Sequence, residues 1–126
     1  MTPEQIQNYN RKCAELMGEE SYKRYSNYHK SEIVFVNYQC GNYMSAEYHI
    51  NWTWQIPVWQ KVSEILYAKL YGMDYLPILF HNAEKIEEDY YEEIRKGAPQ
   101  SAFEFLCQGI DFIEQFKTEK KLKINY

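Results

Sequence analysis

The side chains that could carry nucleophilic or metal chemistry are spread thinly along this chain. They are Cys13, Cys40 and Cys107, and His29, His49 and His81. No two of them form a C-x-x-C pair or an H-E-x-x-H motif, which are spacings typical of zinc sites. The five glycines form neither a G-x-G-x-x-G loop nor a P-loop, so a standard nucleotide site is unsupported. The sequence therefore predicts no catalytic residue, no metal site and no cofactor, although folding could still assemble a cysteine–histidine–carboxylate triad.

The densest charged feature lies between residues 84 and 93. Its six carboxylates belong to Glu84, Glu87, Glu88, Asp89, Glu92 and Glu93. Acidic residues four apart share one face of a helix and repel one another. Because water screens this repulsion, the simplest interpretation is a helix face exposed to solvent. The functional alternative is an acidic face that docks on a basic partner protein, such as one that otherwise binds nucleic acid.

All three tryptophans, Trp52, Trp54 and Trp59, fall within eight residues. Each ring is large and carries one N–H donor, so the cluster either organises a core or builds a binding face. Core packing needs no further assumption and is the favoured interpretation. If a second ring is exposed, the cluster could form a small-ligand or peptide groove together with the neighbouring Tyr48 and His49. The spacing does not decide which tryptophan faces solvent.

Size and charge exclude several classes of protein. The chain has 126 residues and a net charge of −4, and no segment of it is strongly basic. This disfavours a general nucleic-acid-binding protein and leaves only a local basic patch as a route to such binding. No apolar run approaches the ~20 residues of a membrane span, and no signal-peptide core is present. We expect a cytoplasmic protein, without membrane contact, whose cysteines are buried and reduced.

The first half of the chain predicts a helix followed by a hairpin. Thr2, Pro3 and Gln5 form a capping-box start for a helix over residues 3–17. Residues 19–31 are polar and are expected to be irregular. A hairpin over 32–50 follows, with a turn at Gly41-Asn42 that would pair Cys40 with Tyr43.

The second half predicts helices at about 53–71, 83–96 and 99–117. Pro57 is expected in the first turn of the first of these, where its missing N–H costs little. The short apolar run over 75–81 contains a proline and predicts an edge strand, whereas 83–96 could be helix or strand. The expected fold is a single α+β domain over 1–126, in which helices 3–17, 53–71 and 99–117 pack on a small, mainly antiparallel sheet.

Three groups of residues carry a resemblance to a known family. They are residues 1–6 with 14–18, residues 48–62 around the tryptophans, and residues 102–106 with 110–113. In these groups the chain resembles the phage-type ABA-sandwich domain proteins, a family of small phage and prophage proteins from gut bacteria. Thr53 and Gln55 depart from the family pattern, which favours an acidic and an apolar residue there. The resemblance implies an α/β sandwich and no catalytic residue.

Three functions remain open from the sequence. The first is a non-enzymatic interaction or accessory protein of phage or mobile-element origin, with an unknown protein partner and an unknown oligomeric state. The second is a small-ligand-binding or peptide-binding domain that uses the tryptophan region. The third is an enzyme whose site carries no recognisable motif. An exposed acidic helix together with buried tryptophans would favour the first.

Overall fold

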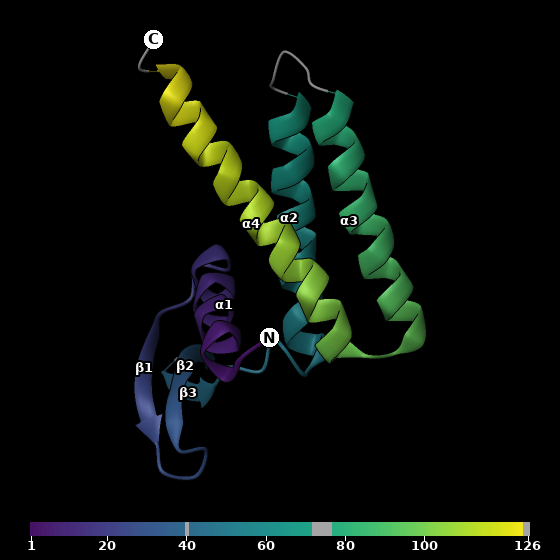
Figure 1. Cartoon of the computed structure of the whole chain (residues 1–126). Helices are drawn as coiled ribbons and strands as arrows, with labels where there is room; N and C mark the ends of the chain where they lie inside the picture. The colour runs from purple at the N-terminus through teal and green to yellow at the C-terminus, as the bar shows by residue number, and fades with distance from the viewer. Residues whose placement is uncertain (40, 72–76, 125–126) are drawn as a thin grey trace. The chain divides into compact units, whose positions relative to one another are not determined.

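A computed structural model describes the backbone of residues 1–39, 41–71 and 77–124, and side chains over 1–37, 41–68 and 81–115. The fold is α+β, with four helices and one antiparallel sheet along the described chain (Figure 1). The chain folds as two compact units, Met1–Val58 and Trp59–Tyr126. The expectation of a single domain stays a prediction. None of the described helices is long and apolar enough to cross a membrane.

The first unit begins with helix α1 (Pro3–Leu16), which confirms the predicted N-terminal helix. The Gln5 amide donates to Thr2 Oγ1 over 3.2 Å, and the Thr2 amide donates to Gln5 Oε1 over 2.9 Å. Both bonds satisfy backbone donors that the helix itself leaves free. The capping box therefore fixes where α1 starts.

The sheet contains strands β1 (Ser21–Ser26), β2 (Ser31–Gln39) and β3 (Asn42–Ser45) in the order β1-β2-β3, all antiparallel. The predicted hairpin is confirmed as β2–β3. The expectation that residues 19–31 are irregular was wrong, because β1 occupies 21–26. Four of its six residues are exposed, so the strand lacks the apolar alternation that reveals a half-buried strand.

Two details of the hairpin also differ from expectation. Strand β3 ends at Ser45 rather than continuing to residue 50, and the chain then turns. Tyr43 pairs with Asn37, and the register shifts between Asn37 and Gln39. The Asn37 Oδ1 accepts a hydrogen bond from the Gly41 amide over 2.9 Å, which supports this bulged turn. Cys40, the expected partner of Tyr43, lies outside the described residues.

Helix α1 covers one face of the sheet. Successive strand residues point to opposite faces, and Lys23, Val34 and Val36 share the face toward α1. Val34 and Val36 are fully buried, and Lys23 Nζ donates to Asn8 Oδ1 of α1 over 2.7 Å. The opposite face presents Tyr22, paired with Phe35. The expectation that the second and fourth helices also cover the sheet stays a prediction.

Helix α2 (Trp52–Tyr71) starts one residue earlier than expected. Asn51 caps it, because its Oδ1 accepts a hydrogen bond from the Thr53 amide over 2.9 Å. Pro57 therefore lies in the second turn, not the first. It has no N–H to donate to the Thr53 carbonyl one turn earlier, and its side chain is exposed.

The second unit contains α3 (Pro77–Lys96) and α4 (Pro99–Ile124). The predicted edge strand over 75–81 was wrong for residues 77–81, which open α3; residues 75 and 76 lie outside the described residues. Pro77 occupies the first helical position, where a missing N–H is harmless. A short apolar run does not by itself separate a strand from a buried helical turn. Residues 83–96 are helical as favoured, and α4 continues beyond the expected end near 117.

The core of the second unit is built around Trp59. Its ring stacks on Tyr90 with centroids 4.2 Å apart and an interplanar angle of 16°, and Tyr90 is fully buried. Gly109 of α4 lies against the same region. A methyl group on Gly109 would come within 2.9 Å of Val62 Cγ1 and 3.6 Å of the Trp59 ring. Because Gly109 has no side chain, α4 packs closely against Val62 and Trp59 of α2.

We expect Gly109→Val to destabilise the protein by about 1–3 kcal/mol, because extra methyl groups would overpack this contact. The matched control is Gln108→Val, which places the same side chain at the exposed neighbouring position. Urea unfolding measures the free energy of unfolding of both variants. Equal stabilities would show that α4 does not approach Val62 this closely.

Candidate functional site

A groove opens in the first unit beside the start of β2. Strand β3 ends at Ser45, opposite Phe35, so the beginning of β2 has no partner strand on that side. The groove has a volume of about 430 Å³. Helix α1, the start of β2 and the 45–50 segment supply its lining through Pro3, Ile6, Gln7, Ser31, Ile33, Glu47, His49 and Ile50, among others. Its size suits a small ligand or part of a peptide.

Helix α1 supplies a polar side chain, Gln7, to the wall of this groove. Gln7 Oε1 accepts a hydrogen bond from the Val34 amide over 2.9 Å, which satisfies a strand donor that β3 does not reach.

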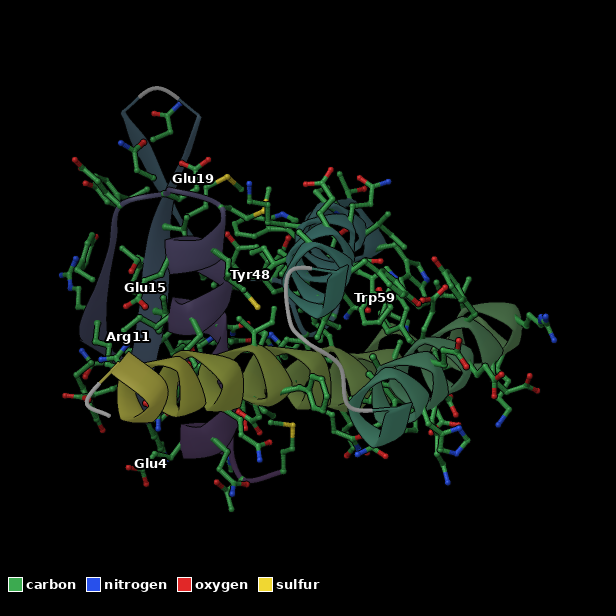
Figure 2. The ribbon with its side chains drawn as sticks, turned by 90° about the horizontal axis from the view of Figure 1, so that it is seen from above. Glu4, Arg11, Glu15, Glu19, Tyr48 and Trp59 are labelled. Atoms are coloured by element: carbon green, nitrogen blue, oxygen red, sulfur yellow. The ribbon has the colours of Figure 1, made fainter. Side chains whose placement is uncertain are left out.

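An exposed ion pair also lies on α1. The Arg11 Nε is 3.8 Å from the Glu15 carboxylate, and both residues are labelled in Figure 2. Because that pair is exposed, we assign it little stabilising energy. The buried contacts, not this ion pair, hold α1 beside the groove.

His49 is a titratable residue that lines the groove and contacts a fully buried side chain. Asn10 is fully buried, and its Nδ2 lies 3.1 Å from His49 Nδ1. If the amide donates, the neutral imidazole carries its proton on Nε2. Among the described residues, Asn10 Oδ1 has no hydrogen-bond partner. Burial lowers the pKa of His49, and the nearby Glu47 carboxylate opposes that shift.

The structure separates the residues of the predicted tryptophan site. Trp54 and Tyr48 are buried in the first unit, with ring centroids 5.0 Å apart in an edge-on arrangement. Trp59 is buried in the second unit, and Tyr48 and Trp59 are both labelled in Figure 2. Trp52 is half-buried. Of these five predicted residues, His49 alone lines the groove. The cluster is therefore mainly a core feature.

The predicted acidic residues divide into two groups on α3. Glu84, Glu88 and Glu92 are exposed, and they follow one another at four-residue steps. Glu87, Asp89 and Glu93 are half-buried. The Tyr67 hydroxyl donates a hydrogen bond to the Glu87 carboxylate. Burial first, and then this carboxylate, raises the pKa of Tyr67.

Two cysteines and His81 are further candidate groups. Cys13 is fully buried, and desolvation raises the pKa of its thiol, so the thiol is protonated at neutral pH. Cys107 is buried in α4, and His81 is exposed in α3. Over the described part of the chain, no three histidine, cysteine or acidic residues gather as metal ligands would.

Sequence reasoning missed an aromatic surface on the sheet. Tyr22 stacks on Phe35 with centroids 5.5 Å apart and also contacts Tyr43 at 5.0 Å. All three lie on the sheet face opposite α1, since Tyr22 pairs with Phe35 and Tyr43 pairs with Asn37 two residues along β2. The available signal was the loop over residues 27–30, which joins a segment with two tyrosines, residues 21–26, to a segment with three β-branched residues, residues 31–36.

Comparisons with family models, with curated proteins and with solved structures found no match for this chain.

We expect the protein to lose stability on acidification because of His49. Its folded-state pKa lies below the ordinary value of 6.5, so the unfolded chain binds the proton more readily. The stabilisation is fully present above that value and is lost as the pH falls through the folded-state pKa. Thermal unfolding between about pH 7.5 and pH 5 should show a smaller loss for His49→Gln than for the wild type.

His81→Gln, which removes an exposed histidine, is the control and should keep the wild-type loss because His49 is intact. If His49→Gln and the wild type show the same pH dependence, the buried Asn10–His49 contact does not control protonation.

Proposed function

We propose that this chain is a non-enzymatic interaction protein that binds a basic partner protein through α3. The binding surface is the acidic face, defined as Glu84, Glu88 and Glu92. These three side chains are exposed, whereas Ala83 and Tyr90 of the same helix are buried. This separation of an acidic side from a core side is the observation that carries the proposal.

The acidic face opposes the stability of its own helix. Like charges four residues apart repel by a few tenths of a kcal/mol per pair, about 0.2–0.5 kcal/mol. A helix serving only as packing would gain from neutral residues here. Their presence supports a role outside the fold.

Nearby cations compensate only the end of this row. Arg95 donates to Glu92 over 3.3 Å, and Lys96 donates to Glu93 over 3.3 Å. Within the described residues, Glu84 and Glu88 form no salt bridge. Two carboxylates of the acidic face are thus available to a basic partner, and such complementarity mainly favours specificity and fast association.

The sequence resemblance supports a phage or mobile-element origin for this accessory role. The buried free thiols of Cys13 and Cys107 fit a reducing compartment, which supports placement in the cytoplasm.

The groove beside His49 supports a second candidate, a small-ligand-binding or peptide-binding domain. A neighbouring hollow of about 490 Å³ shares Pro3, Gln7 and Ser31 with it, so together they form an extended surface. Ser31→Trp would fill both. Peptides are first selected from a random library for binding to the wild-type protein. We expect their affinity for the Ser31→Trp variant to be lower by at least about tenfold. Peptides that bind both proteins equally would exclude the groove.

Affinity capture from a bacterial lysate tests the acidic face. The variant Glu84→Gln/Glu88→Gln/Glu92→Gln removes the charge and the repulsion, so it should recover less of a basic partner while its melting temperature stays equal or rises. The matched control is Glu4→Gln/Glu64→Gln/Glu104→Gln, which neutralises three exposed carboxylates dispersed over α1, α2 and α4.

The control should recover the same proteins as the wild type. Identical recovery by the α3 variant, or no specific recovery by the wild type, would reject the acidic face as a binding surface.

A further inference from the structure

We propose that the sheet face opposite α1 binds single-stranded nucleic acid by base stacking and phosphate contact. This surface, called the aromatic sheet face, is defined by Tyr22, Phe35, Tyr43 and Arg24, and the exposed Lys30 lies in the loop that joins β1 to β2. It is distinct from the acidic face of α3, so the inference does not depend on the proposed function.

Two of the three rings are partly exposed, and the third, Phe35, is half-buried. Tyr22 is 42% exposed and Tyr43 is 43% exposed, although both contact another aromatic ring. The Tyr22–Phe35 pair is close to parallel, with an interplanar angle of 16°. Cross-strand packing thus holds the rings in place before any ligand arrives, which limits the entropy lost on binding. Ordered rings that are partly exposed on a sheet face can stack unpaired bases.

The charge beside these rings is positive, although the chain as a whole is acidic. The eleven residues from Ser21 to Ser31 include Lys23, Arg24 and Lys30 and contain no aspartate or glutamate. Arg24 lies opposite Ile33 and therefore shares the face of Tyr22 and Phe35. Over the described part of the chain, Arg24 and Lys30 form no salt bridge. Both cations can therefore contact phosphates.

The loop at the end of this face keeps a cation in an unfavourable backbone conformation. Lys30 has a φ of 53°, in the left-handed region that favours glycine or asparagine. Beside it, Tyr28 is 89% exposed and meets His29 edge-on at 4.9 Å. A glycine would suit the turn better, so the lysine supports a role for its charge rather than for the turn.

The opposite end of the face is less suited to phosphate. Glu20 accepts a hydrogen bond from the Tyr43 hydroxyl over 3.1 Å, which places a carboxylate there. The phosphates are therefore expected to run toward Arg24 and Lys30, with bases over Tyr22 and Phe35. A flat face of this kind stacks bases that are already unpaired, which selects single strands over duplexes.

Fluorescence anisotropy with labelled single-stranded oligonucleotides of about 15 nucleotides, as DNA and as RNA, tests the inference. The wild type should bind at about 50 mM salt and release the strand at about 200 mM salt. Tyr22→Leu/Tyr43→Leu retains apolar bulk but removes the rings, and should weaken binding at least about fivefold. Tyr43→Phe retains the ring, loses the bond to Glu20 and should bind as the wild type does.

The charge variant Arg24→Gln/Lys30→Gln changes two exposed side chains. It therefore tests nucleic-acid binding even if the leucine variant fails to fold. It should weaken binding and reduce the slope of log affinity against log salt by about 1.4, which corresponds to two phosphates. The matched control Lys61→Gln/Lys85→Gln neutralises two exposed lysines of α2 and α3 and should leave binding unchanged.

Three results would overturn the inference. The first is no binding by the wild type at low salt, and the second is equal loss of binding in both charge variants. The third is concentration-dependent self-association in sedimentation that Tyr22→Leu/Tyr43→Leu abolishes without any oligonucleotide binding, because that assigns the aromatic sheet face to a second copy of the chain.

Discussion

The first unit depends on a buried hydrogen bond between Gln55 and the carbonyl of Tyr48. Gln55 is fully buried, and its Nε2 donates to Tyr48 O over 2.8 Å. Leaving such an amide unpaired would cost about 1–3 kcal/mol, so the bond ties the start of α2 to the turn before it. The edge-on contact of Tyr48 with Trp54 reinforces the same link. The turn held in this way carries Glu47, His49 and Ile50, which line the groove.

This bond gives a structural reason for a polar residue at position 55. An apolar side chain could fill the space but could not pair with the Tyr48 carbonyl. A buried polar group that is fully bonded specifies one geometry, whereas an apolar contact permits several. The polar residue therefore positions the groove wall at a point where β3 has already ended.

The sequence predicted the elements whose signals are local. The capping box at Thr2 and Gln5 and the long apolar stripes predicted α1 and α2 within one residue of their observed bounds, and also the start of α4. Gly41-Asn42 predicted the β2–β3 hairpin. It missed β1 because an exposed strand has no alternating pattern to detect. It assigned 77–81 to a strand because a proline followed by apolar residues suits both an edge strand and a helix start.

The site was predicted less well, because burial depends on packing partners. Trp54 and Trp59 are five residues apart, so they project from different sides of α2. Trp54 contacts Tyr48 edge-on, and Trp59 stacks on Tyr90. His49 precedes the helix and reaches the groove instead. Spacing alone cannot show this, since it gives the direction of each ring but not the element that covers it.

The charge of the chain has a similar limit as a guide to partners. The net charge of −4 is the sum of an acidic row on α3, a basic, tyrosine-rich hairpin and the rest of the chain. In ordinary salt, screening limits the electrostatic effect of each charge to about 10 Å. A partner therefore meets the local charge. Both surfaces also carry residues that their own backbone disfavours, namely repelling glutamates at four-residue steps and a lysine at a positive φ. Exposed residues that oppose local stability are expected at functional sites, which is why both surfaces are proposed to bind.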